Sequence, residues 1–216
     1  ATFGNPTGAF IDEVLQWTRQ FLEGTGKRIE MRKASGFIVD GHGDLHCRNI
    51  FLTDPPVIFD CIEFSKELRT LDMLNEAAFL CMDLERLGRD DLAGAFLTRY
   101  DQLTGVFENE TDRRLFMYYK MYRANVRLKV LCLQMQEGRG SQAELDMIGQ
   151  YMRVFRGYYR QLSGYGTGRE GPHVIGDRRV REFIAARSHF RYEDSDLSSL
   201  RPGVQKTQWN FPRHSE

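Results

Sequence analysis

The stretch HGDLHCRNIFL occupies residues 42–52, and VIFD follows it at residues 57–60. The two apolar runs within this segment are separated by TDPP, a sequence typical of a turn. Short apolar runs on either side of such a turn predict a small β-hairpin. Polar residues flank the hairpin, since Asp44 and Asn49 precede it and Asp60 follows it. Pairing of the two runs would bring two carboxylates and one amide close together.

Helical patterns occupy most of the chain on both sides of this hairpin. Upstream, apolar residues recur at helical spacing from Gly8 to Glu23, and Gly24 is expected to end that helix. A basic connector then leads to a short apolar strand at residues 36–39. Downstream, glycines separate four further helical patterns, at residues 71–87, 91–103, 112–136 and 142–162.

These patterns predict an α+β fold, predominantly helical, over residues 1–163. Residues 164–216 are rich in glycine, arginine and serine, and we expect them to form a charged, weakly packed tail. Lys+Arg and Asp+Glu balance at 30 each, so no net field favours a nucleic-acid or membrane partner. The four cysteines form no C-x-x-C pair, and the N-terminal sequence has no signal-peptide pattern. We therefore expect a cytoplasmic protein with reduced thiols.

The polar residues around the hairpin suit phosphoryl transfer. Catalysis of this reaction consists mostly of positioning the reactants and neutralising charge. One carboxylate must orient the acceptor hydroxyl, and Mg²⁺ prefers one or two carboxylates together with phosphate and water. We interpret Asp44 as the catalytic base and Asn49 and Asp60 as Mg²⁺ ligands that also hold the ATP phosphates.

The motif H-G-D-L-H-x-x-N-I, followed by an apolar strand and Asp60, resembles the aminoglycoside-phosphotransferase and choline-kinase superfamily, relatives of protein kinases. FDCIEF at residues 59–64, AAFLCMDL at 77–84 and YKMYRANVRLKV at 119–130 are similar to a bacterial subgroup commonly fused to a P-loop ATP-binding domain. The resemblance implies a protein-kinase-like C-lobe whose catalytic loop lies on the hairpin. It also implies ATP and Mg²⁺ as cofactors and a hydroxyl of a small molecule as acceptor.

Two parts of such a kinase are not recognisable. The residues before His42 read mostly as one helix, so the N-lobe with its nucleotide-covering loop and lysine is expected to be missing. No G-x-x-x-x-G-K-[ST] motif occurs, so the fused P-loop domain is expected to be missing as well. A separate N-lobe or P-loop domain is therefore a candidate partner.

Several further residues are candidates for supporting roles. His42 is interpreted as a structural hydrogen-bonding residue that shapes the loop, whereas His46 either approaches the phosphates or faces solvent. Glu63 either supports the metal site or is an ordinary surface glutamate. The resemblance implies that an acidic pair, Asp72 and Glu76, braces the catalytic loop.

Three basic residues recur at helical spacing within the YKMYRANVRLKV segment: Lys120, Arg123 and Arg127. They form either an anion-binding stripe for a phosphorylated or acidic acceptor, or a solvated and salt-bridged face of the helix.

Two other functions are alternatives to a kinase: a metallophosphoesterase and an inactive binding module. The D-x-H spacing of Asp44 and His46 occurs in metallophosphoesterases, but the G-N-H element that this class also needs is absent from the sequence. The other rival is a catalytically inactive kinase-like fragment that serves as a binding or scaffold module. ATP affinity separates this rival from a kinase, because a scaffold needs none.

Overall fold

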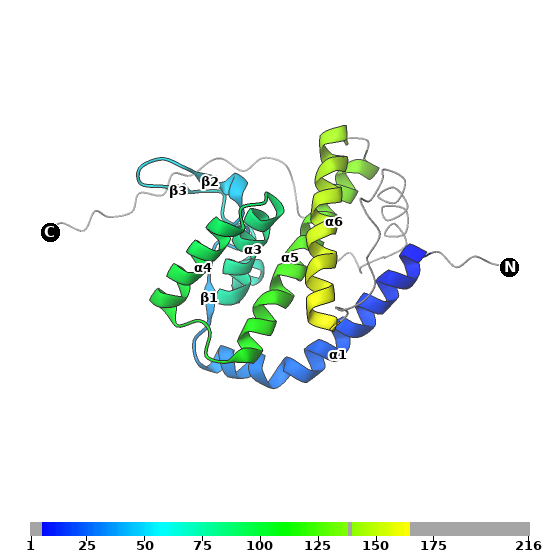
Figure 1. The fold of residues 1–216 in the computed structure, drawn as a ribbon. Helices are drawn as coiled ribbons and strands as arrows, with labels where there is room; N and C mark the ends of the chain where they lie inside the picture. The colour runs from blue at the N-terminus through cyan, green and yellow to red at the C-terminus, as the bar shows by residue number, and fades with distance from the viewer. Residues whose placement is uncertain (1–5, 138–139, 165–216) are drawn as a thin grey trace.

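The structure is a computed structural model and describes residues 6–137 and 140–164 (Figure 1). The described chain is predominantly helical and carries two small antiparallel sheets, in agreement with the predicted α+β class. The helices are α1 (Pro6–Ala34), α2 (Lys66–Arg69), α3 (Met73–Arg86), α4 (Asp90–Thr104), α5 (Glu110–Gln136) and α6 (Gln142–Ser163). The strands are β1 (Ile38–Asp40), β2 (Ile50–Phe51), β3 (Val57–Ile58) and β4 (Thr70–Asp72).

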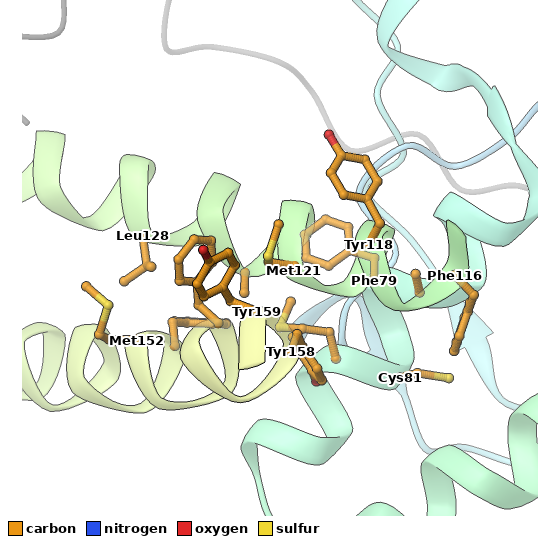
Figure 2. Close-up of a cluster of buried hydrophobic side chains, with 14 of the residues drawn as sticks. Phe79, Cys81, Phe116, Tyr118, Met121, Leu128, Met152, Tyr158 and Tyr159 are labelled. Atoms are coloured by element: carbon orange, nitrogen blue, oxygen red, sulfur yellow. The ribbon is translucent and has the colours of Figure 1, made fainter. Parts of the chain in front are cut away.

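The core lies where α3, α5 and α6 pack together. Helix α3 is buried on nearly all sides, and its Leu74, Phe79 and Met82 are fully shielded from solvent. Figure 2 shows Leu128 of α5 and Met152 of α6 in the space between these two long helices. A helix with apolar residues on most of its circumference belongs in the interior of a domain. The buried α3 therefore provides the rigid support on which the loop at residues 41–49 rests.

Helix α1 is longer than predicted, because it continues through Gly24 to Ala34. The interpretation of Gly24 as a helix stop, followed by a basic connector, is wrong. A glycine inside a helix costs about 1 kcal/mol, which tertiary contacts can offset. Those contacts come from Arg28, which pairs with Asp112 at 2.7 Å, and from the fully buried Arg32. In Figure 1, α1 runs along the bottom of the molecule, past the start of α5 and the end of α6.

The helix predicted from residue 71 begins two residues later, at Met73. Leu71 and Asp72 belong instead to β4, which pairs with β1 in the register Ile38↔Asp72 and Val39↔Leu71. Asp72 is the N-cap of α3, and its carboxylate accepts a hydrogen bond from the amide of Leu74 at 2.8 Å. An N-cap residue has extended backbone angles, which explains why the strand can end where the helix starts.

The predicted hairpin is confirmed. Strands β2 and β3 pair in the register Ile50↔Ile58 and Phe51↔Val57, and Phe51 stacks on Phe59 with ring centroids 4.4 Å apart. The hairpin projects beyond α3 and α4 at the upper left of Figure 1.

The predicted tail at residues 164–216 lies outside the described residues, apart from Gly164, which ends α6 with φ 72°. Among the described helices, none combines the length and the apolar composition that crossing a lipid bilayer requires.

Candidate functional site

The start of the candidate catalytic loop is held by Glu76 on α3. The carboxylate oxygen Oε2 of Glu76 accepts hydrogen bonds from the backbone amides of His42 at 2.7 Å and Gly43 at 3.1 Å. Gly43 has φ 80°, and a Cβ at this position would lie 3.0 Å from Cδ1 of Ile62. The left-handed backbone and the close approach both favour glycine here. The buried glutamate thus fixes the point at which the loop leaves β1.

The end of the same loop is held by a second buried carboxylate, that of Asp83. Its Oδ2 accepts a hydrogen bond from the amide of Cys47 at 3.1 Å. Its Oδ1 accepts from Arg86 Nε at 2.7 Å and from the Tyr151 hydroxyl at 2.9 Å. Positions 76 and 83 lie seven residues apart on α3 and therefore on one face of the helix. The two carboxylates therefore hold the loop at both ends, Glu76 at residues 42 and 43 and Asp83 at residue 47.

Asp83 was not predicted as a site residue. It stands inside the apolar run of residues 77–84, which is typical of a core helix. A carboxylate within such a run must find partners when it is buried, since an unpaired buried charge is strongly unfavourable. This isolated aspartate was therefore the signal that could have identified the second anchor.

Acidification is expected to weaken the Asp83 anchor. Burial alone would raise the pKa of the Asp83 carboxyl, but its bonds to Arg86 and Tyr151 and to the Cys47 amide lower this pKa below its usual value. A carboxyl with a lower pKa in the folded state stabilises the fold fully above the unfolded pKa of about 3.9. That contribution is lost as the pH falls through the folded pKa. At neutral pH we expect Asp83→Asn to lower the free energy of unfolding by about 1.5–3 kcal/mol.

This prediction can be checked by urea unfolding of wild type and Asp83→Asn at a series of pH values. The difference between the two proteins should shrink below about pH 4, as the wild-type carboxyl becomes protonated. A difference that stays constant from neutral pH to about pH 3 would contradict the assigned role.

Asp44 lies in the middle of the loop, close to the other polar residues predicted for the site. Its Oδ2 is 3.4 Å from Nε2 of His46. The side-chain amide of Asn49 donates a hydrogen bond to the backbone oxygen of Asp44 at 3.0 Å. The Asp44 side chain is 36% exposed, so a ligand can reach it, whereas His46 and Asn49 are each 5% exposed. The solvent-facing alternative for His46 is therefore wrong.

The electrostatic surroundings of Asp44 favour its ionised form. Burial alone would raise the pKa of this carboxyl, but the hydrogen bond to His46 and the charges of Arg127 and Arg123 outweigh burial. The pKa of Asp44 consequently lies below its usual value. Near neutral pH the side chain is a carboxylate that can accept a hydrogen bond from a hydroxyl.

His42 connects the loop to the segment that carries Asp60. Its Nδ1 accepts a hydrogen bond from the amide of Asp44 at 3.2 Å, and its Nε2 lies 2.8 Å from the carbonyl oxygen of Phe59. Because Nδ1 accepts, the ring proton belongs on Nε2 and is donated to Phe59. The backbone oxygen of His42 also accepts from the amide of Ile62 at 3.0 Å. One histidine therefore bridges two separate segments of the site.

Asp60 follows β3 and is exposed, with an unusual φ of 62°. Non-glycine residues rarely adopt positive φ, and such strain tends to occur at functional sites. The amide of Phe59 donates to the carbonyl oxygen of Asn49 at 3.0 Å, which holds the two segments side by side. The hairpin thus brings Asp60 to the same end of the sheet as Asn49 and Asp44.

This donor set fits a hard cation. The Asn49 amide nitrogen is engaged by Asp44, which leaves its oxygen as a neutral ligand, and Asp60 offers an exposed carboxylate. Within the described ranges, no cluster of three or more His, Cys, Asp or Glu residues could hold a metal ion by itself. A cation bound here would therefore complete its coordination with phosphate and water, as Mg²⁺ does.

The remaining predicted supporting residues are Glu63 and Asp72. Glu63 is exposed beyond the hairpin. Asp72 directs its carboxylate to Arg32, with contacts of 2.7 and 2.8 Å, and so fastens α1 to α3. Bracing of the loop by both members of the acidic pair is therefore incorrect. In the part of the chain that the structure describes, Glu76 contacts the loop and Asp72 does not.

The predicted basic stripe does not form a single surface, because α5 turns two of its three residues toward α3 and α6. Lys120 binds Glu85 at 2.8 Å and lies over the ring of Tyr158. Arg123 is 7% exposed and donates to the carbonyl oxygen of Gly43 at 3.0 Å. These two residues have structural partners. The third, Arg127, forms no ion pair or hydrogen bond within the part of the chain that the structure describes.

Comparison with known proteins identifies relatives without a described activity. The chain is 41% identical over 134 residues to uncharacterized proteins of Mycobacterium tuberculosis and Mycobacterium bovis. The aligned region covers 62% of this chain and 26% of each relative, so the chain spans about a quarter of the length of these relatives. No family model and no solved structure matches the sequence.

Proposed function

We propose that the chain is a protein-kinase-like C-lobe that transfers the γ-phosphoryl group of ATP to a hydroxyl of a small molecule. The observation that carries this proposal is the contact between Asn49 and Asp44 in one loop, beside the segment that leads into Asp60. The Asn49 amide contacts Asp44 at 3.0 Å, and the backbone bond between Phe59 and Asn49 brings in Asp60. An ionised carboxylate beside two oxygen ligands for a cation is the arrangement that phosphoryl transfer requires.

In the proposed reaction Asp44 accepts a hydrogen bond from the acceptor hydroxyl and directs its oxygen at the γ-phosphorus. The new bond joins that oxygen to phosphorus, the bond to the β–γ bridging oxygen breaks, and ADP leaves. The hydroxyl proton passes to Asp44. A carboxylate with a lowered pKa is a weak base, so its main contribution is to orient the hydroxyl.

The remaining residues position this carboxylate or hold the nucleotide. His46, buried against Phe79, fixes the direction of the Asp44 side chain and is a positioning residue. Asn49 and Asp60 would hold Mg²⁺ together with the ATP phosphates. The cation supplies neutralisation of the charge on the transferring group.

The first test is Mg²⁺-dependent binding of ATP, measured by calorimetry on the wild-type chain and on Asp60→Ala. Loss of the carboxylate is expected to weaken binding by about 10- to 100-fold, the equivalent of one charge-assisted contact. Asp60→Gly should behave in the same way, although glycine relieves the strain of φ 62°. Loss of binding in both variants therefore cannot be attributed to backbone strain.

Asp54, an exposed carboxylate in the turn of the hairpin, provides the matched control. Asp54→Ala should bind ATP as the wild type does. Binding that survives in Asp60→Ala, or that is equally strong without Mg²⁺, would contradict the proposed metal site.

An exposed apolar surface supports the proposal that a separate lobe completes the enzyme. Phe51 is 56% exposed, Leu52 92%, and both residues of β3 about half. Phe64 and Leu68, which follow the hairpin, are also exposed. A contiguous apolar surface of this kind commonly marks an interaction site. We propose that a nucleotide-covering lobe docks on the hairpin, next to Asp60.

The same surface favours the second candidate, an inactive module that only binds a partner. The two candidates differ in ATP affinity, since a binding module needs none. If the chain does not bind ATP either alone or with its docked lobe, the result would support the inactive binding module and contradict the kinase.

A further inference from the structure

Arg127 on α5 lies beside the middle of the candidate catalytic loop. Arg123, one helical turn earlier, contacts the carbonyl oxygen of Gly43. The Arg127 guanidinium lies over the ring of Tyr151, 5.9 Å from its centroid, and the hydroxyl of Tyr151 reaches the carboxylate that holds Cys47. The charge of Arg127 also acts on the carboxylate of Asp44, which lies between loop positions 43 and 47.

The charge of Arg127 acts on the Asp44 carboxylate, but the buried Nε of its guanidinium has no hydrogen-bond partner among residues 6–137 and 140–164. The neighbouring cations differ in this respect, since Lys120 has Glu85 and Arg86 has Asp83 as partners. A buried donor without an acceptor destabilises the fold, so it calls for an explanation such as an absent ligand.

The position of Arg127 relative to the proposed nucleotide ligands also indicates which substrate it would contact. The nucleotide ligands Asn49 and Asp60 belong to the hairpin end, and in Figure 1 the hairpin projects away from α6. Arg127 is on α5 and lies over the ring of Tyr151 on α6, and neither helix belongs to the hairpin. A group that contacts Arg127 is thus placed to belong to the acceptor and not to the nucleotide.

We propose that Arg127 binds a carboxylate or phosphate group of the acceptor, so that the acceptor is an acidic hydroxyl compound. The inference rests on the proposed function and deepens it. A guanidinium binds either oxyanion through paired hydrogen bonds. Its charge also lowers the pKa of Asp44, the carboxylate proposed to orient the acceptor hydroxyl. A polycationic acceptor would instead meet the charges of Arg123 and Arg127.

The test uses three probes that carry the same kind of hydroxyl but differ in charge: glycerol, glycerate and glycerol 3-phosphate. Their binding to the 216-residue chain is followed by nuclear magnetic resonance titration. We expect both anions to bind about 10- to 100-fold more tightly than glycerol. Arg127→Gln should abolish this preference, and Arg127→Lys, which retains the charge but not the planar fork, should keep part of it.

Arg153, an exposed arginine on α6, is the control for a general change in charge. Arg153→Gln should leave the preference for anions intact, and urea unfolding of each variant establishes that it is folded. Tighter binding of only one of the two anions would support the proposal and identify the oxyanion. Equal affinity for glycerol and the anions, or a preference unchanged in Arg127→Gln, would overturn it.

Binding of Mg²⁺ and ATP, measured on the same samples, separates this inference from the proposed function. An Arg127-dependent preference for anions, without ATP binding by the chain either alone or with its docked lobe, would contradict the proposed function alone. Intact ATP binding without such a preference would contradict the acidic acceptor alone.

Discussion

Replacement of Asp72 by asparagine is expected to lower the free energy of unfolding by about 1.5–3 kcal/mol, because it removes one of the two buried carboxylate partners of Arg32 and leaves Asp112. Arg32 is fully buried, and its guanidinium meets both oxygens of Asp72 at 2.7 and 2.8 Å. It also donates to the carbonyl oxygen of Val106 at 2.9 Å. Asparagine retains a side-chain oxygen that can cap α3, so the substitution removes the charge while sparing the cap.

Urea unfolding followed by circular dichroism measures this effect. The exposed pair Arg89–Asp91 supplies the control, because Asp91→Asn should change stability by less than about 1 kcal/mol. Replacing both Arg32 and Asp72, as in Arg32→Met with Asp72→Asn, should cost less than the sum of the two single changes, since Asp112 keeps Arg28 as its partner. If Asp72→Asn were as mild as the exposed control, the attachment of α1 through Arg32 would be of little consequence to the fold.

Replacement of Asp44 by asparagine is expected to slow phosphoryl transfer by about 10²–10⁴-fold, because the amide can neither take the proton nor orient the hydroxyl through a charge. Binding of ATP should remain, since Asn49 and Asp60 are unchanged. The rate is measured as transfer of labelled γ-phosphoryl to the acceptor. If the chain alone does not bind ATP, the proposed nucleotide-covering lobe is added to the assay. The isosteric change keeps the packing around His46.

Asp40 provides the matched control for this experiment. Its exposed carboxylate at the end of β1 pairs with Arg69 at 2.6 Å. Asp40→Asn should retain the wild-type rate. Transfer that is as fast in Asp44→Asn as in the wild type would remove Asp44 from the reaction and with it the proposed mechanism.

Local patterns were sufficient to predict the hairpin and most of the helices. Turn residues between two apolar runs specified β2 and β3, and Gly105, with φ 60°, ends α4 close to its predicted boundary. The length of α1 could not be predicted in this way. Its second half is stabilised by Arg28 and Arg32, whose partners lie 84 and 40 residues away along the chain. Contacts this distant leave no trace in local periodicity.

The candidate site shows the same difference between features set by local sequence and features set by distant contacts. Asp44, Asn49 and Asp60 could be grouped from sequence, because the hairpin that joins them is local. The roles of the helical charges could not be predicted, since each depends on which neighbouring helix covers it. Asp83 became a loop anchor because Tyr151 of α6 packs above it, and Lys120 became a structural residue because Glu85 faces it.

The path of α1 also has a consequence for the order in which the protein can assemble. This helix precedes its partners along the chain, and the hydroxyl of Tyr159 bonds to Glu13, which lies 146 positions earlier. During synthesis, the aromatic face of α1, with Trp17 and Phe21, must wait for Tyr118 and Tyr159 before it can be covered. Contacts of such large sequence separation form late and slow folding. The nascent chain therefore exposes an aromatic helix until α6 has been made, and during that interval it is open to chaperones and to aggregation.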